Sequence, residues 1–359
     1  NSARPCAEVA HYHTEGARLK IILDCDTGID DAVAIAYALA SPEAEILGIG
    51  SVHGNVEADL AADNTLKLLK VAGRTEIPVA LGADRPMLRP LLTAKWVHGE
   101  DGLGNSNMSP SGLKVSGEHA ADQIIRLARE FPGEVTLVPV GPLTNLGIAL
   151  IKEPELPRLI KQVVLMGGTA AEPGNVSPVA EANVWHDPHA ASLVFAAPWP
   201  IVMAGLDVTM KTLLLDEHLD RWRESRSPVA EFLLKVVPFY IEFSSRSLGR
   251  RACAMHDAVA VGLALGAVQD LESHVLPVVV AVEEGPALGQ TIVDRRPIEG
   301  TLYTAEGRAW LTSQVSEQYH ALVEAAFSVP DPHTRVMMRI EGPAFVEHLV
   351  ERVAAYNQS

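Results

Sequence analysis

Four carboxylate side chains lie close together near the start of the sequence, in the stretch KIILDCDTGIDDA at residues 20–32. Asp24 and Asp26 follow a short apolar run, and Asp30 and Asp31 are neighbours in the chain. An apolar run that ends at a turn signal is typical of a buried strand, and the pattern AVAIAYALA after the last aspartate is typical of a helix. All four carboxylates are therefore expected in one strand-to-helix turn.

The crowding of these carboxylates indicates a metal site. A helix N-terminus stabilises one or two negative charges through its dipole and free N–H groups, but four side by side require a counter-charge. Carboxylate oxygens suit a hard cation such as Ca²⁺ or Mg²⁺, which needs no thiolate or imidazole ligand. A purely structural alternative makes Asp24 a hydrogen-bonding residue, Asp30 an N-cap and Asp31 a first-turn charge. That alternative leaves Asp26 without a role.

Short apolar runs alternate with helical patterns through the rest of the chain. This alternation predicts an α/β fold in one domain, with an open, mainly parallel sheet and helices on both faces. We expect strands at residues 21–23, 46–49, 78–81, 135–140, 162–166, 200–204 and 275–282, and helices at 30–40, 57–72 and 118–130.

The carboxyl ends of these strands are the expected position of the site, because ligands of such sheets bind in the crevice beyond them. Asp26, Asn55, Val140 and Met166 each follow a different predicted strand. We therefore expect these four residues to meet in one crevice. The irregular segment 82–117 is also of interest, since a connection this long is usually functional or mobile.

The composition, with 48% hydrophobic residues, is ample for the core of a globular enzyme. The formal net charge of −16 argues against nucleic acid and anionic membranes as partners. No apolar run approaches the ~20 residues of a membrane span. Cys6, Cys25 and Cys253 have no paired spacing, which favours a reducing, cytoplasmic setting. Residues 1–18 lack the apolar segment of a signal peptide, so we expect a disordered N-terminal extension there and a catalytic domain over 19–359.

Eight short matches together resemble the nucleoside hydrolases of the inosine–uridine type. The aspartate stretch is similar to that family's D-x-D-P-G-x-D-D-A signature, with Thr27 where proline is usual. An alanine, Ala182, also replaces an aromatic residue that is usual there. The other segments follow the family's order: Asn55, HGEDGLG at 98–104, VGPLTN at 140–145, MGG at 166–168, GNV at 174–176, EAN at 181–183 and HD at 256–257.

The resemblance implies a Ca²⁺ ion and the hydrolysis of an N-glycosidic bond. The metal ligands would be Asp26, Asp31, Asp257 and the main-chain carbonyl of Val140, a set of oxygens that calcium accepts. A metal-bound water and the ribose hydroxyls would complete the coordination. Asp26 would take the proton of that water, and the reaction would pass through an oxocarbenium-like transition state. On the residues alone, Asp257 could instead cap the helix that follows it.

The resemblance also implies which residues contact a ribonucleoside. The sugar would be held by Asp30, Asn55, Met166, Asn175, Glu181 and Asn183, and the products would be ribose and a free purine or pyrimidine base. His98 would line the base pocket. His256 would donate a proton to the leaving base, or else hold the neighbouring metal ligand through a hydrogen bond. The expected assembly is a homodimer or homotetramer.

Two other functions remain open on the sequence. LDCDTG at residues 23–28 also resembles the D-x-D-x-[TV] turn of haloacid-dehalogenase-like phosphatases. Asp24 would then be the nucleophile, Asp26 the acid/base and Mg²⁺ the metal. That assignment leaves Asp30 and Asp31 unexplained. The third function is a metal-dependent ribose-binding protein without turnover, against which the retained Asp26 argues.

The residues that contact the leaving base also remain open. The segment 243–252, before the His-Asp pair, contains Phe243 as its only aromatic residue and three arginines, Arg246, Arg250 and Arg251. These arginines form either a solvated helix face or a polar contact to the base.

Overall fold

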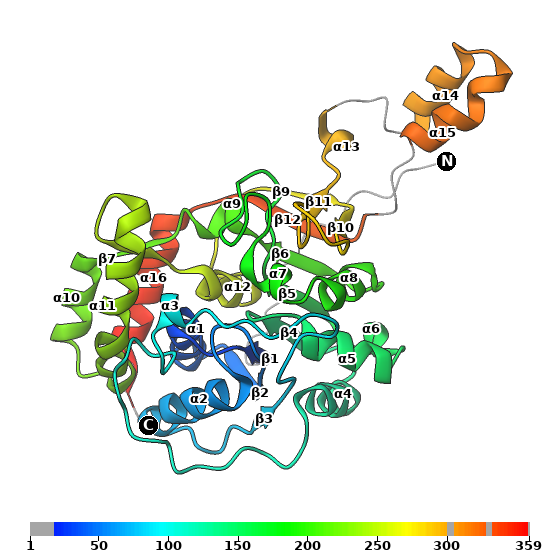
Figure 1. Ribbon diagram of the computed structural model, residues 1–359. Coiled ribbons are helices and arrows are strands. Elements are labelled where there is room, and N and C mark those ends of the chain that lie inside the picture. Colours follow the sequence, from blue (N-terminus) through cyan, green and yellow to red (C-terminus); the bar gives the residue numbers. More distant parts are fainter. Residues whose placement is uncertain (1–17, 300–304, 328–331, 358–359) are drawn as a thin grey trace.

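Apolar runs from both halves of the chain form one large sheet at the centre of the protein (Figure 1). The computed structural model describes residues 18–299, 305–327 and 332–357. The strands of the sheet are β1 (Leu19–Cys25), β2 (Ala44–Ser51), β3 (Val79–Leu81), β4 (Thr136–Pro139), β5 (Gln162–Met166), β6 (Ile201–Ala204), β9 (Asp270–Leu276) and β12 (Thr334–Ile340). Their order is β3-β2-β1-β4-β5-β6-β12-β9, and only β9 runs antiparallel to its neighbour.

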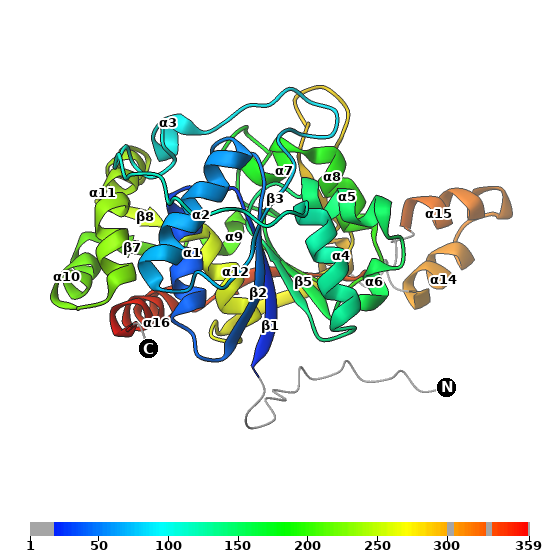
Figure 2. The same cartoon turned by 90° about the horizontal axis from the view of Figure 1, so that it is seen from below.

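Helices cover both faces of this sheet (Figure 2). One face carries α1 (Ile29–Leu39), α2 (Ala58–Ala72), α11 (Pro228–Leu248), α12 (His256–Ala264) and α16 (Gly342–Ala355). The other carries α4 (Ala120–Glu130), α5 (Thr144–Lys152) and α8 (Pro188–Ala196). Two hydrophobic clusters result, because successive strand residues point to opposite faces. On β1, for example, Ile21 and Leu23 belong to one cluster and Ile22 to the other.

The remaining helices and strands lie outside the large sheet. The helices are α3 (Lys95–His98), α6 (Leu156–Leu159), α7 (Ala182–His186), α9 (Leu206–Thr209), α10 (Asp216–Glu224), α13 (Arg296–Glu299), α14 (Ala305–Ser313), the 3₁₀ helix η2 (Glu317–Tyr319) and α15 (His320–Phe327). Two antiparallel pairs join β7 (Leu213–Leu215) to β8 (Ala252–Ala254), and β10 (Val278–Val280) to β11 (Thr291–Val293). Within the described ranges, no helix has the length and apolarity needed to cross a membrane.

The structure confirms the predicted fold class and corrects two of its details. The strand predicted at 275–282 is wrong as a single element, since Pro277 separates β9 of the large sheet from β10 of the small one. Proline has no N–H to donate and disrupts a continuous strand ladder. The sequence interpretation also missed β12, which lies between β6 and β9. The predicted extension, residues 1–18, falls outside the described residues except for Arg18.

The parallel order places the carboxyl ends of β1, β2, β4 and β5 at one edge of the sheet. The backbone links them there: Val140 N donates to Asp24 O at 2.8 Å, and Val52 N donates to Cys25 O at 3.0 Å. Loops and helix starts that follow these strands therefore converge, as predicted from the topology.

Because the core packs on both faces of the sheet, we expect a large loss of stability when a buried side chain of a central strand is shortened. Ile22 is 1% exposed and packs against the face that carries α4 and α5. We expect Ile22→Ala to lower the free energy of unfolding by about 2–5 kcal/mol, through lost burial and the cavity that remains. Ile151→Ala is the control, because Ile151 is 65% exposed and should change stability by less than about 0.5 kcal/mol. Urea unfolding of both variants checks this, and equal midpoints would contradict it.

Candidate functional site

Three buried carboxyl groups form an acidic cluster at this edge of the sheet. One oxygen from each of Asp30, Asp31 and Asp257 lies within 4.8 Å of the others, close enough to share one metal ion. Asp30 and Asp31 belong to the first turn of α1, and Asp257 to the first turn of α12, which packs against α1. Within the described ranges, no second group of three such ligands occurs.

Asp26 adjoins this acidic cluster. Its carboxyl group lies close enough to that of Asp31 for each to shift the pKa of the other. Its Oδ2 accepts the backbone N–H of Asn55 at 2.6 Å, and the side-chain amide of Asn55 donates to Asp31 Oδ2 at 3.0 Å. Gly54 makes this approach sterically acceptable, because a Cβ there would lie 2.0 Å from Asp26 Oδ2. The structure thus brings Asp26, Asp31 and Asn55 together, as the topology predicted.

Burial raises the pKa of each of these carboxyl groups. The pKa of Asp30 and that of Asp31 rise to about 6. The pKa values of Asp26 and Asp257 rise well above their usual range. Loss of hydration is the largest cause, and the charges of neighbouring carboxylates add to it for Asp26, Asp31 and Asp257. A cation at this position would restore the charged forms, since it replaces the lost hydration and cancels the mutual repulsion.

The oxygens of the cluster fit such a cation. Oδ1 of Asp26, of Asp30 and of Asp31 is buried without a hydrogen-bond partner among the described residues. Buried carboxylate oxygens normally accept at least one hydrogen bond, so three orphaned ones in one place require another partner. Because these ligands are oxygens, the site fits Ca²⁺ or Mg²⁺ better than a softer metal.

Asn183 joins the ends of β4 and β5. Its side-chain amide donates to the carbonyl oxygens of Val140 at 2.7 Å and Met166 at 3.2 Å. Glu181 caps α7, since its carboxylate accepts the backbone N–H groups of Asn183 at 2.8 Å and Val184 at 3.1 Å. The same carboxylate accepts the backbone N–H of Gly168, which follows β5, at 2.9 Å. Burial raises the pKa of Glu181 to about 7. These four predicted residues therefore meet at one place.

Asn175 lies farther out than the other predicted substrate residues. It is exposed, and its Oδ1 accepts the backbone N–H of Ala182 at 2.9 Å. This bond fixes the start of α7, which carries Asn183.

Two of the predicted histidines are buried beside the carboxylates. His98 Nδ1 accepts the backbone N–H of Ile29 at 3.1 Å and lies 3.8 Å from Asp30 Oδ1. His256 Nδ1 lies 2.8 Å from Thr209 Oγ1. Burial lowers the pKa of both imidazoles to about 4, so both are neutral near pH 7. Since Nδ1 of His98 accepts a hydrogen bond, its proton resides on Nε2.

The sequence interpretation missed one aromatic residue of the site, Tyr240. Its ring stacks on His98 with centroids 5.4 Å apart, and burial together with the nearby charge of Asp30 raises the pKa of its hydroxyl well above the usual range. Tyr240 precedes the segment 243–252 by one helical turn and shares a helix face with Ser244, which is buried. This helical spacing is the sequence signal that could have revealed Tyr240. Arg251 pairs instead with Asp216 and Glu242.

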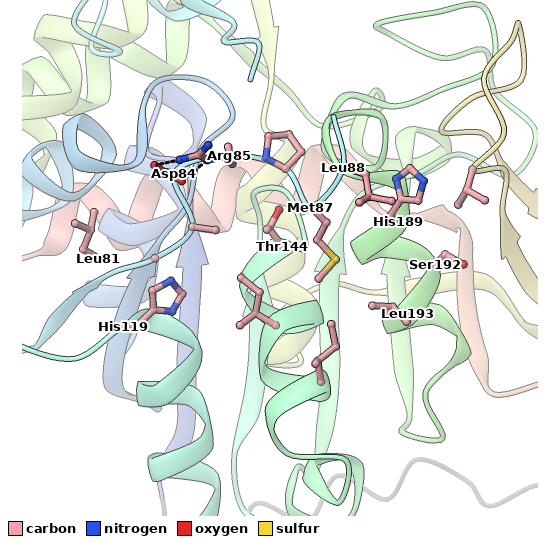
Figure 3. Close-up of a pocket in the computed structure, with 16 residues that line it drawn as sticks. Leu81, Asp84, Arg85, Met87, Leu88, His119, Thr144, His189, Ser192 and Leu193 are labelled. Atoms are coloured by element: carbon pink, nitrogen blue, oxygen red, sulfur yellow. Dashed lines mark hydrogen bonds and ion pairs between the residues drawn. The ribbon is translucent and has the colours of Figure 1, made fainter. Parts of the chain in front are cut away.

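A large surface groove lies apart from the acidic cluster. It has a volume of about 1050 Å³ and is lined by the segment 81–88, α5 and α8 (Figure 3). Its lining is mainly apolar and includes Leu88, 75% exposed, and Ile151. Neither Asp26 nor any aspartate of the acidic cluster borders it. This groove is therefore not where the carboxylates could act.

Comparison with known proteins identifies the family. Residues 21–347 match the family described as inosine-uridine preferring nucleoside hydrolase. The probable uridine nucleosidase 2 of Arabidopsis thaliana is 35% identical over 340 residues, covering 94% of this chain and 98% of that protein. The solved structure of a plant nucleoside hydrolase superposes with a TM-score of 0.82 at 30% identity, over 94% of this chain and 99% of that one. A purine-preferring ribonucleoside hydrolase from Gardnerella vaginalis gives a TM-score of 0.80 at 31% identity, with coverage of 94% and 99%. The chain belongs to the inosine-uridine preferring nucleoside hydrolase family and is an N-ribosyl hydrolase of ribonucleosides.

Proposed function

We propose that this enzyme is a Ca²⁺-dependent hydrolase of purine and pyrimidine ribonucleosides. The observation that carries the proposal is the acidic cluster, which combines orphaned carboxylate oxygens with the amides of Asn55 and Asn183. Such a set suits a cation and a polyol together. Both base classes are included because one relative is named for uridine and another for purines.

We assign the metal to Asp26, Asp31, Asp257 and the carbonyl oxygen of Val140. Three carboxylates exceed the charge of a divalent ion, which would retain the metal in the absence of substrate. Asp30 completes the group of three oxygens within 4.8 Å. We assign it to a ribose hydroxyl, because it retains one buried oxygen without a partner among the described residues. Bound Ca²⁺ would supply Lewis acidity toward the attacking water and attraction for the ribose hydroxyls.

Asp26 is the proposed general base. One of its oxygens holds the backbone of Asn55, while the other has no partner among the described residues. That second oxygen is free to accept the proton of the attacking water. The positive charge that develops on the sugar in an oxocarbenium-like transition state would face several carboxylates, which stabilise it electrostatically.

The remaining polar residues would bind the sugar. Asn55, Asn175, Glu181 and Asn183 are proposed to orient the ribose hydroxyls, with Met166 beside them. Binding energy on these non-reacting hydroxyls can be used to orient and distort the ring. The cap that Glu181 forms on α7 supports this role, since it fixes the helix that carries Asn183.

The leaving base would meet the two histidines. We propose His256 as the proton donor and His98 as a contact of the base. Because burial lowers the pKa of His256 to about 4, the imidazole would have to take up a proton as substrate binds before it passes that proton to the base. The Nε2–H of His98 and the Tyr240 ring stacked on it support a pocket for a flat, polar group. We further propose a homodimer or homotetramer in a cytoplasmic setting, which the buried free thiols of Cys25 and Cys253 favour.

Two observations argue against the phosphatase alternative. The family is that of nucleoside hydrolases over nearly the whole chain. Asp24, the phosphatase nucleophile, is buried and accepts the side-chain amide of Asn145 at 2.9 Å, away from the clustered oxygens. Incubation with uridine and inosine tests the proposal. Release of ribose and free base supports it, release of phosphate from a phosphate ester would indicate the phosphatase, and binding without products would indicate the ribose-binding protein.

The metal assignment predicts about one calcium per chain in protein purified without added metal, as expected for a closed set of oxygen ligands. Asp257→Asn should lower this stoichiometry, because it removes a ligand charge. Asp24→Asn is the control and should retain the metal, since Asp24 faces Asn145. Elemental analysis measures all three proteins. Zinc, or full activity after complete removal of metal by a chelator, would refute the assignment.

The assignment of Asp26 as the general base predicts a selective loss of turnover. Asp26→Asn should lower kcat by at least about 10²- to 10⁴-fold, the usual contribution of general base catalysis, while nucleoside still binds. Asp24→Asn should have a far smaller effect. Steady-state kinetics with calorimetric binding separates the two quantities. Near-normal turnover of Asp26→Asn would show that another residue activates the water.

The assignment of His256 as the proton donor predicts that the loss of activity in its variant depends on the leaving group. His256→Ala should impair inosine and uridine far more than p-nitrophenyl riboside, because nitrophenolate leaves without protonation. His119→Ala is the control, since His119 caps α4 and borders the distant groove. Values of kcat/KM for three substrates provide the comparison. An equal loss on all three would place His256 in a positioning role beside Asp257.

A further inference from the structure

A buried hydrogen-bonded relay lies between the acidic cluster and the surface groove. It consists of His53, Thr144 and Asp187, each at most 1% exposed. His53 Nε2 lies 3.0 Å from Thr144 Oγ1, and Thr144 Oγ1 donates to Asp187 Oδ2 at 2.8 Å. Thr144 also borders the groove (Figure 3), so the relay extends from the interior to the surface.

The chemistry of the three groups allows one arrangement of protons. A threonine hydroxyl has a single hydrogen, and Thr144 donates it to Asp187. His53 must therefore donate its Nε2–H to the same hydroxyl oxygen. Burial lowers the pKa of His53 to about 3, so the imidazole is neutral and its Nδ1 carries no proton. Each link of the relay thus has a fixed direction.

The relay connects two segments of the proposed ribose site. His53 precedes Gly54, which packs against Asp26, and Asn55, whose N–H binds that carboxylate. At the other end, Asp187 follows α7, which carries Asn183. Asp187 also accepts the backbone N–H of Ala190 at 3.0 Å.

A fourth segment joins through the same carboxylate. Asp187 Oδ2 accepts the backbone N–H of Met87 at 2.9 Å. Four segments that are distant in the sequence therefore converge on two side chains, Thr144 and Asp187. Hydrogen bonds in a buried, low-dielectric setting are strong and directional, so they define separations that apolar packing alone would leave adaptable.

We propose that His53, Thr144 and Asp187 are positioning residues for nucleoside hydrolysis. They hold Asn55 and Asn183 at the separation that one ribose requires, and keep Asn55 against Asp26. This inference rests on the proposed function of those residues. Its physical reason is that a displacement of about 1 Å, even from a distance, can reduce an enzymatic rate by about 10²-fold.

The test compares two substitutions of one side chain. Thr144→Val keeps the shape and removes both hydrogen bonds, so KM for uridine and inosine should rise by about 10-fold, with a fall in kcat. Thr144→Ser keeps the hydroxyl and should return both constants to within about twofold of the unmodified enzyme. The control is Thr136→Val, because Thr136 is a buried β4 residue whose hydroxyl has no partner among the described residues.

The change in KM distinguishes positioning from a merely structural role. Partial unfolding lowers the concentration of active enzyme, and hence the apparent kcat, but leaves KM unchanged. An unchanged KM in folded Thr144→Val would overturn the inference, as would an equal rise in Thr136→Val. If Thr144→Val does not fold, Asp187→Asn is measured in its place, with the same expected rise. An unmodified enzyme that releases no ribose would instead refute the proposed function.

Discussion

The mutual repulsion of buried carboxylates is the constraint that organises this enzyme. Asp26, Asp30, Asp31 and Asp257 are each at most 7% exposed, in a space where water cannot hydrate them. Uncompensated charges in such a place are very unfavourable, so the surrounding structure must neutralise or coordinate them. The first turn of α1 and the amides of Asn55 meet part of this need, and the proposed divalent cation would meet the rest. The same arrangement suits a reaction in which the sugar becomes positively charged.

The backbone must approach these carboxylates closely, and glycine permits the approach. A Cβ on Gly28 would lie 2.6 Å from His98 Nδ1, and one on Gly54 would lie 2.0 Å from Asp26 Oδ2. The imidazole of His98 and the backbone of Asn55 therefore contact the aspartate turn directly. Apolar volume is concentrated elsewhere, in the groove beside α5 and α8, so this groove and the chemical site are separate.

Asp24 and Asp26, at the carboxyl end of β1, have different roles. Asp24 and Asp26 are separated by one residue, yet Asp24 binds Asn145, one residue after Thr144, while Asp26 joins the acidic cluster. Burial raises the pKa of Asp24 to about 7 without a neighbouring carboxylate among the causes. The polar groups at this edge thus divide into a set around the acidic cluster and a set that holds the start of α5 and the junction of α7 with α8.

The sequence by itself determined the fold class, the family and the crowded aspartate turn. It could do so because alternating apolar runs and a strand-to-helix turn are local patterns, and parallel strands bring their carboxyl ends to one edge. Only the tertiary structure revealed Tyr240 beside His98, the separation of β9 from β10, and the relay through His53, Thr144 and Asp187. Those features depend on contacts between residues far apart in the chain, and local spacing carries no information about which buried hydroxyl, imidazole and carboxylate will meet.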